Sequence, residues 1–148
     1  MSAINKIIVG GVTHDIADNS PYTVLHQQTG GTIDVTFAAP QRDVMILINL
    51  PSGTVRPACS IYFKQGEDIC GQGYCSASTL SADGFLYTRC WDEHGMFLSE
   101  YVSQNSVSAV NKYAYANRIM PVETGITKVE SSVAFPSGVS ITVYGVPK

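Results

Sequence analysis

The chain has 148 residues, the length of one domain, and 45% of them are hydrophobic, which is enough for a core without stabilising disulfides or metals. Charged residues make up 14%, compared with roughly 25% in an average soluble domain. The surface is therefore expected to be mostly uncharged and polar, which suits contacts with copies of the chain or with neutral partners such as glycans. The net charge of −3 and the absence of a basic cluster argue against nucleic-acid binding.

No apolar run approaches the roughly 20 residues that a membrane helix needs, so no membrane partner is expected. The opening residues MSAINK lack the apolar stretch of a secretion signal. We therefore expect a protein that is made in the cytoplasm and stays there or leaves without a cleaved leader. Its four cysteines, Cys59, Cys70, Cys75 and Cys90, are then expected to be reduced thiols.

The first predicted element is a β-hairpin within residues 3–18. The segments IIV, residues 7–9, and VTHDI, residues 12–16, flank a Gly10-Gly11 turn. An isolated hairpin is marginally stable in water, so it is expected to lie on the following domain or on a neighbouring subunit. Residues 18–21 suit a short linker, and we predict a docking hairpin with linker over 1–20 and a separate domain over 21–148. The predicted docking residues are Ile7, Val9, Val12 and Ile16.

The rest of the chain alternates between apolar and polar residues, with glycine- and proline-containing turns at short spacing. Strands are expected over residues 32–37, 85–91 and 139–143. The continuous apolar run 45–50 predicts a central strand buried on both faces. This pattern predicts an all-β fold, an antiparallel β-sandwich or jelly roll. Residues 106–116 fit a helix or a strand equally well.

Residues 66–73, GEDICGQG, are rich in glycine but lack the lysine of a phosphate-binding loop. They predict a long surface loop between strands, of the kind that often carries recognition.

The segment RCWDEHG, residues 89–95, is the best candidate binding site. It holds the only tryptophan of the chain at the start of a predicted turn. A sugar ring stacks on an exposed aromatic face, and neighbouring carboxylates bind its hydroxyls. The alternative is a core tryptophan at a strand end, followed by a polar turn. The candidate ligand-binding residues are Trp91, Asp92, Glu93 and His94.

Metal and catalytic sites have little support in the sequence. A zinc site would have to combine Cys70, Cys75, Cys90 and His94, but the chain has no second closely spaced cysteine pair. The buried-thiol interpretation is therefore preferred, and no cofactor or metal is expected. No Gly-x-Ser-x-Gly motif occurs, and the spacing of the carboxylates selects no catalytic pair. We therefore expect a protein that is not an enzyme.

Both ends of the chain resemble one family. Residues 4–18, INKIIVGGVTHDIAD, resemble the N-terminal segment of many phage and prophage virion proteins, with His14 in place of their aromatic residue. Residues 126–146, ITKVESSVAFPSGVSITVYGV, resemble the C-terminal signature of phage β-sandwich appendage domains, Phe-x-x-Gly-x-x-Ile-x-Val-Tyr-Gly. The resemblance does not extend to residues 22–121.

This resemblance implies a structural component of a tailed-phage virion. The leading hypothesis is a tail, baseplate or head-fibre appendage whose loops bind a host surface or glycan. The alternative is a capsid decoration, collar or tail-ring subunit with a purely structural role, and a small carbohydrate-active enzyme is a third. Other virion proteins would be partners. A homo-oligomer is expected because sheet edges and an uncharged surface need covering, and analogy with fibres favours a trimer.

Overall fold

The computed structural model describes residues 6–9, 12–15, 21–75, 77–79, 83–91, 95–103, 108–110, 114–118 and 122–148. These residues form strands and connecting turns without a helix, and the strands pair antiparallel. The predicted all-β sandwich is therefore confirmed. No helix that could cross a membrane occurs in this part of the chain.

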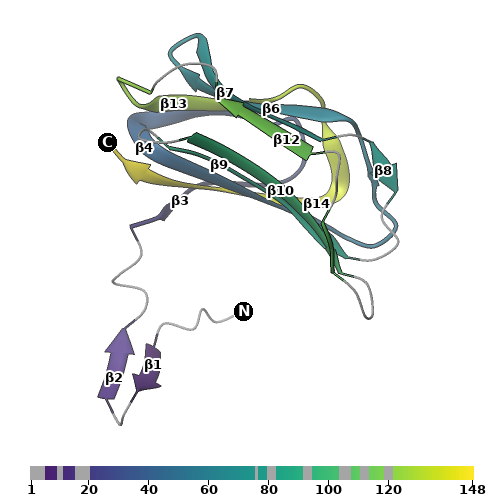
Figure 1. Ribbon diagram of the computed structural model, residues 1–148, viewed down its shortest axis with the longest axis horizontal. Coiled ribbons are helices and arrows are strands. Elements are labelled where there is room, and N and C mark those ends of the chain that lie inside the picture. Colours follow the sequence, from purple (N-terminus) through teal and green to yellow (C-terminus); the bar gives the residue numbers. More distant parts are fainter. Residues whose placement is uncertain are drawn as a thin grey trace.

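The sandwich has two layers, which Figure 1 shows in edge view. We call them the β9 layer and the β13 layer. The β9 layer has the spatial order β3 (Thr23–Gly31), β14 (Phe135–Pro147), the second half of β4 (Asp34–Leu50), β9 (Gly84–Trp91), β10 (Gly95–Ser103) and β11 (Ser108–Val110). The β13 layer has the order first half of β4, β13 (Ile126–Ser131), β6 (Cys59–Gln65), β7 (Asp68–Cys75) and β12 (Ala114–Arg118).

One long strand, β4, belongs to both layers. It has 17 residues. Its first half pairs with β13, and its second half, from Asp43 on, pairs with β14 and β9. The change of partner occurs around Pro40 and Gln41, where a proline removes one backbone donor from the ladder. Figure 1 shows β4 passing from one layer to the other, so the layers are two halves of one folded sheet.

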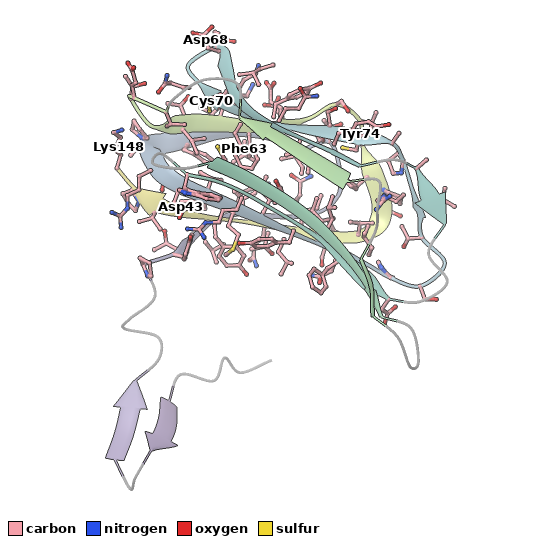
Figure 2. The ribbon with its side chains drawn as sticks, in the orientation of Figure 1. Asp43, Phe63, Asp68, Cys70, Tyr74 and Lys148 are labelled. Carbon is pink, nitrogen blue, oxygen red and sulfur yellow. The ribbon has the colours of Figure 1, made fainter. Side chains whose placement is uncertain are left out.

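The core lies between the layers and is built by alternation. In β4, Val44, Ile46 and Ile48 are buried, and in β9 Leu86, Thr88 and Cys90 are buried. Phe63 of β6 lies between the layers (Figure 2). Of the predicted strand over 32–37, Ile33 and Val35 are buried in the core and Phe37 packs against it. Other core residues are Leu50, Cys59, Ile61, Cys70, Val122, Ile126, Val129, Phe135, Val139, Ile141 and Val143.

The prediction that residues 45–50 are buried on both faces was wrong. This strand is central, but Met45 and Leu47 are only half-buried and Asn49 is exposed. The reason is that β4 has the core on one side only. On the outer face, Met45 and Leu47 are flanked by residues of β9 and β14, and no further layer formed by the described residues covers them.

The predicted loop over residues 66–73 was also wrong, because this segment is mainly strand. A tight turn at Gly66, with φ of 63°, joins β6 to β7. Within β7, Gly71 is paired with Phe63 and Gly73 with Ile61. Large side chains opposite a glycine fill the space that the missing side chain leaves, which stabilises a strand that its own composition disfavours.

The structure also contains a small additional sheet and resolves the type of the described residues in the region 106–116. A small sheet pairs β5 (Val55–Arg56) with β8 (Ser78–Thr79). The region 106–116 contains β11 and the start of β12, so its described residues follow the strand alternative.

The N-terminal hairpin is present as a separate two-stranded sheet. It pairs β1 (Lys6–Val9) with β2 (Val12–Asp15), and Val9 opposes Val12 across the glycine pair. The predicted docking residues Ile7, Val9 and Val12 lie in these strands, whereas Ile16 lies outside the described residues. Docking and the domain boundary at residue 20 stay predictions.

Gly30 closes the end of β3 against β14. Its φ is 61°, and a Cβ atom there would lie 2.7 Å from Ser137 Cα and 2.9 Å from the Pro136 carbonyl oxygen. Both are backbone atoms that cannot rotate away. Gly53 also has a positive φ, of 81°, but a Cβ there would meet nothing within 4 Å.

We therefore expect Gly30→Ala to destabilise the protein more than Gly53→Ala. The left-handed conformation alone costs an alanine about 1–2 kcal/mol. Overpacking against the backbone adds about 1–3 kcal/mol at Gly30 only. Urea unfolding of both variants measures the difference. Equal losses would show that the β3–β14 contact is looser than described.

Candidate functional site

The candidate site lies on the outer face of the β9 layer, at the end of β9. Since Leu86, Thr88 and Cys90 point into the core, alternation places Arg89 and Trp91 on the outer face. Asp43 of β4 pairs with Trp91 in register, and Met45 pairs with Arg89. This pairing brings a carboxylate, which is distant in sequence, next to the arginine and the tryptophan.

Asp43 and Arg89 form an ion pair with several hydrogen bonds. Arg89 Nε donates to Asp43 Oδ1 at 3.0 Å, and Arg89 Nη2 donates to Asp43 Oδ2 at 2.5 Å. The Tyr22 hydroxyl also donates to Asp43 Oδ2, at 2.6 Å. The Asp43 side chain is 12% exposed and that of Arg89 is 36% exposed. The carboxylate is therefore largely enclosed by its partners, whereas the guanidinium reaches solvent.

The guanidinium of Arg89 also lies against two aromatic rings. Its Cζ is 4.8 Å from the centre of the Trp91 ring and 5.8 Å from the centre of the Tyr22 ring. Both distances are within the range of a cation–π contact. The two rings and the carboxylate together restrict the arginine to one orientation.

The charges of this cluster shift the pKa values of its members. Burial and the hydrogen bond to Asp43 raise the pKa of Tyr22 to about 12. The hydrogen bond to Asp43 raises the pKa of Arg89 above its usual value. Burial also raises the pKa of Tyr87, which lies two residues before Arg89 on the same face of β9. The arginine therefore stays charged and the tyrosines stay neutral at physiological pH.

An open hollow of about 310 Å³ lies over this cluster. It offers aromatic surface, a guanidinium and the exposed Arg42. Asp43 accepts hydrogen bonds from Tyr22 and Arg89 and thereby orients the arginine. This chemistry suits binding of a polar ligand by stacking and hydrogen bonding. The hollow is lined by Pro21, Tyr22, Arg42, Asp43, Arg89, Trp91 and Val146.

Of the four predicted ligand-binding residues, the structure places one at this hollow. Trp91 is half-buried and lines it, whereas Asp92, Glu93 and His94 lie outside the described residues. Sequence reasoning missed Tyr22 and Asp43. Nothing local in the sequence marks either residue, because both reach the site through strand pairing.

Two of the three cysteines considered for a zinc site, Cys70 and Cys90, lie in the core. Cys59, Cys70 and Cys90 are buried, and Cys70 Sγ donates to the Phe63 carbonyl oxygen at 3.2 Å. Cys70 is in the β13 layer and Cys90 in the β9 layer. The side chains of Cys75 and His94 are outside the described part. Within that part, no three potential ligand residues gather into a metal-binding group.

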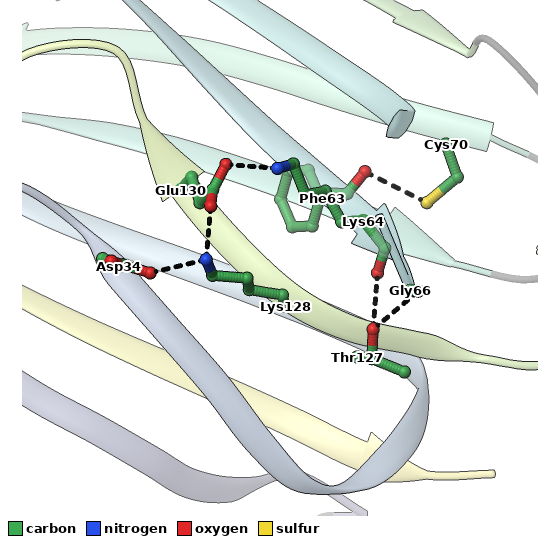
Figure 3. A network of polar contacts seen from close by, with 8 residues as sticks. All are labelled: Asp34, Phe63, Lys64, Gly66, Cys70, Thr127, Lys128 and Glu130. Atoms are coloured by element: carbon green, nitrogen blue, oxygen red, sulfur yellow. Dashed lines mark hydrogen bonds and ion pairs between the residues drawn. The ribbon is translucent and has the colours of Figure 1, made fainter. Parts of the chain in front are cut away.

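A second polar cluster lies on the outer face of the β13 layer (Figure 3). Glu130 contacts Lys64 at 2.7 Å and also contacts Lys128, which in turn reaches Asp34 at 2.9 Å. The two lysines lower the pKa of the Glu130 carboxyl. Because the network joins β6, β13 and β4 and its charges satisfy one another, we assign it to strand alignment rather than to binding.

The chain matches no family model, and no curated protein matches it.

The Tyr22–Asp43 hydrogen bond gives a measurable alkaline transition. In a spectrophotometric titration, we expect the difference between the wild type and Tyr22→Phe to show a tyrosine with a pKa of about 12. In Asp43→Asn this transition moves to lower pH, because the carboxylate no longer disfavours the phenolate and Arg89 favours it.

The raised pKa of Tyr22 also determines how the stability of the folded state changes with pH. Folding raises the Tyr22 pKa from 10.0 to about 12. The contribution of protonated Tyr22 to the free energy of unfolding is therefore complete below pH 10 and is lost as the pH rises through 12. A Tyr22 transition near pH 10 in the folded wild type would contradict the hydrogen bond.

Proposed function

We propose that this chain is a structural component of a tailed-phage particle, an appendage protein of the tail, baseplate or head-fibre type. In this proposal the β-sandwich presents a binding site for a host surface, and the contact is non-catalytic. The proposal is supported by the resemblance at both ends of the chain, by the all-β sandwich and by the low share of charged residues, 14%.

The C-terminal signature has a clear physical meaning in this sandwich. Its apolar positions Phe135, Ile141 and Val143 are 3%, 1% and 0% exposed, and all belong to the core cluster. A Cβ at Gly145 would lie 2.4 Å from Leu25 Cδ1 and 2.6 Å from Gln41 Oε1, so these two side chains occupy the space beside the final glycine. The signature therefore describes the packing of the strand between β3 and β4. What the chain shares with appendage domains is thus a set of core positions, which supports a common architecture.

The observation that carries the binding part of the proposal is the Trp91–Arg89–Asp43 arrangement beside an open hollow. Stacking on an aromatic ring and hydrogen bonding to an arginine held by a carboxylate are means of binding a sugar. An uncharged or weakly charged glycan fits the low charge of the chain. We therefore propose a host-surface glycan as the ligand, and this hollow as its binding site.

Binding is tested with purified full-length protein on host cells and on a glycan array. We expect Trp91→Ala to lower affinity at least tenfold, because stacking on an aromatic side chain is a main source of sugar affinity, and Trp91→Phe to retain part of it. The matched control is Tyr62→Ala, on the outer face of the other layer, which should bind like the wild type. If the wild type binds neither cells nor glycans, the site proposal fails and the purely structural alternative, a decoration, collar or tail-ring subunit, takes its place.

Particle membership is tested separately. An antibody against the chain should label purified phage particles at one fixed position by electron microscopy, after induction of the host that carries the gene. Particles that contain no copies of the chain would overturn the virion assignment, whatever the glycan result.

A further inference from the structure

Strand β3 is an edge strand among the described strands of the sandwich. It pairs with β14 on one side and with no described strand on the other. Its nine residues, TVLHQQTGG, include no lysine, arginine, aspartate, glutamate or proline. Val24 is 54% exposed, and Thr23, Gln27 and Thr29 are exposed as well. Natural sheets usually protect such an edge with charges or proline.

The opposite situation holds at the first half of β4, an edge of the β13 layer. That strand carries Asp34 and Pro40, and Asp34 is paired with Lys128. The chain thus blocks one edge against pairing and leaves β3 available. Along β3 the register is irregular next to Val24, whereas residues 26–29 pair evenly with β14. A regular run of four residues is therefore free to accept another strand.

The N-terminal hairpin could pair with such an open edge, because it has unpaired edges of its own. β1 and β2 have four residues each, and each leaves one edge of its own unpaired in the separate sheet that they form. A hairpin of this size is not stable alone in water, so it needs a surface that continues its sheet. Figure 1 shows β1 and β2 lying apart from the sandwich of their own chain.

We propose that the hairpin β1–β2 of one copy adds to the β3 edge of a second copy, so that the chain assembles by strand donation. Backbone hydrogen bonds supply the attraction, as in other β-strand additions. Residues 16–22, which join β2 to β3, span at most roughly 25 Å, so donor and acceptor sandwiches lie close together. This proposal does not depend on the proposed function, since it concerns only how copies of the chain associate.

The test measures the mass of the full-length chain by light scattering. The wild type is expected at a multiple of 15.9 kDa. Val12→Pro removes a backbone donor from β2, and Val24→Lys with Gln27→Lys charges the β3 edge. Each variant is expected to fall to 15.9 kDa, the mass of one chain. The matched control, Val55→Lys with Ala58→Lys, adds the same charge at exposed positions away from β3 and should associate like the wild type.

Mixing the two association-defective variants provides the sharper test. Val12→Pro keeps an intact β3 edge, and the double lysine variant keeps an intact hairpin, so the mixture should form a species of two chains that neither forms alone. Circular dichroism establishes that each variant is folded. A monomeric wild type, association that survives Val12→Pro, or a mixture that stays monomeric would each overturn strand donation. Association that survives Val12→Pro would point to pairing of β3 with β3, and a mixture that stays monomeric would point to another interface.

Discussion

The fold depends on the passage of β4 from one layer to the other. Because the first half of this strand pairs with β13 and the second half with β9 and β14, a single strand joins the two layers of the sandwich. The two layers can therefore not slide past each other without breaking the ladder of β4. Burial of one face of each layer supplies the hydrophobic stabilisation, and the continuity of β4 sets how the layers are aligned.

The candidate site follows directly from this passage. Asp43 is the first residue of β4 that pairs with β9, and its partner Trp91 is the last residue of β9. The site thus lies where the β9 layer begins to fold over. Tyr22 comes just before β3, so two other segments, this one and β9, converge on the Asp43 carboxylate of β4. The surrounding strands hold this cluster rigidly, which favours a binding site that changes little when a ligand arrives.

Local patterns were enough to predict some of these features. The alternating pattern predicted the strand over residues 85–91, and the glycine pair between two short β-forming segments predicted the N-terminal hairpin. Asp43 could not be found this way, because its place beside Trp91 results from pairing between strands far apart in sequence. The same cause explains the error at residues 66–73, where the large residues that support Gly71 and Gly73 belong to another strand. At residues 45–50, the continuous apolar composition predicted burial on both faces, but only alternate side chains of this strand face the core.

The position of β14 has a consequence for folding. This strand pairs with β3 on one side and with the second half of β4 on the other. The strands β3 and β4 are therefore joined in one sheet only when β14 is in place. During synthesis, β3 and β4 leave the ribosome long before β14 does, and each then has an unsatisfied ladder. Closure of the domain is therefore a late, long-range event, with slow folding and a period in which nascent chains are vulnerable to mispairing.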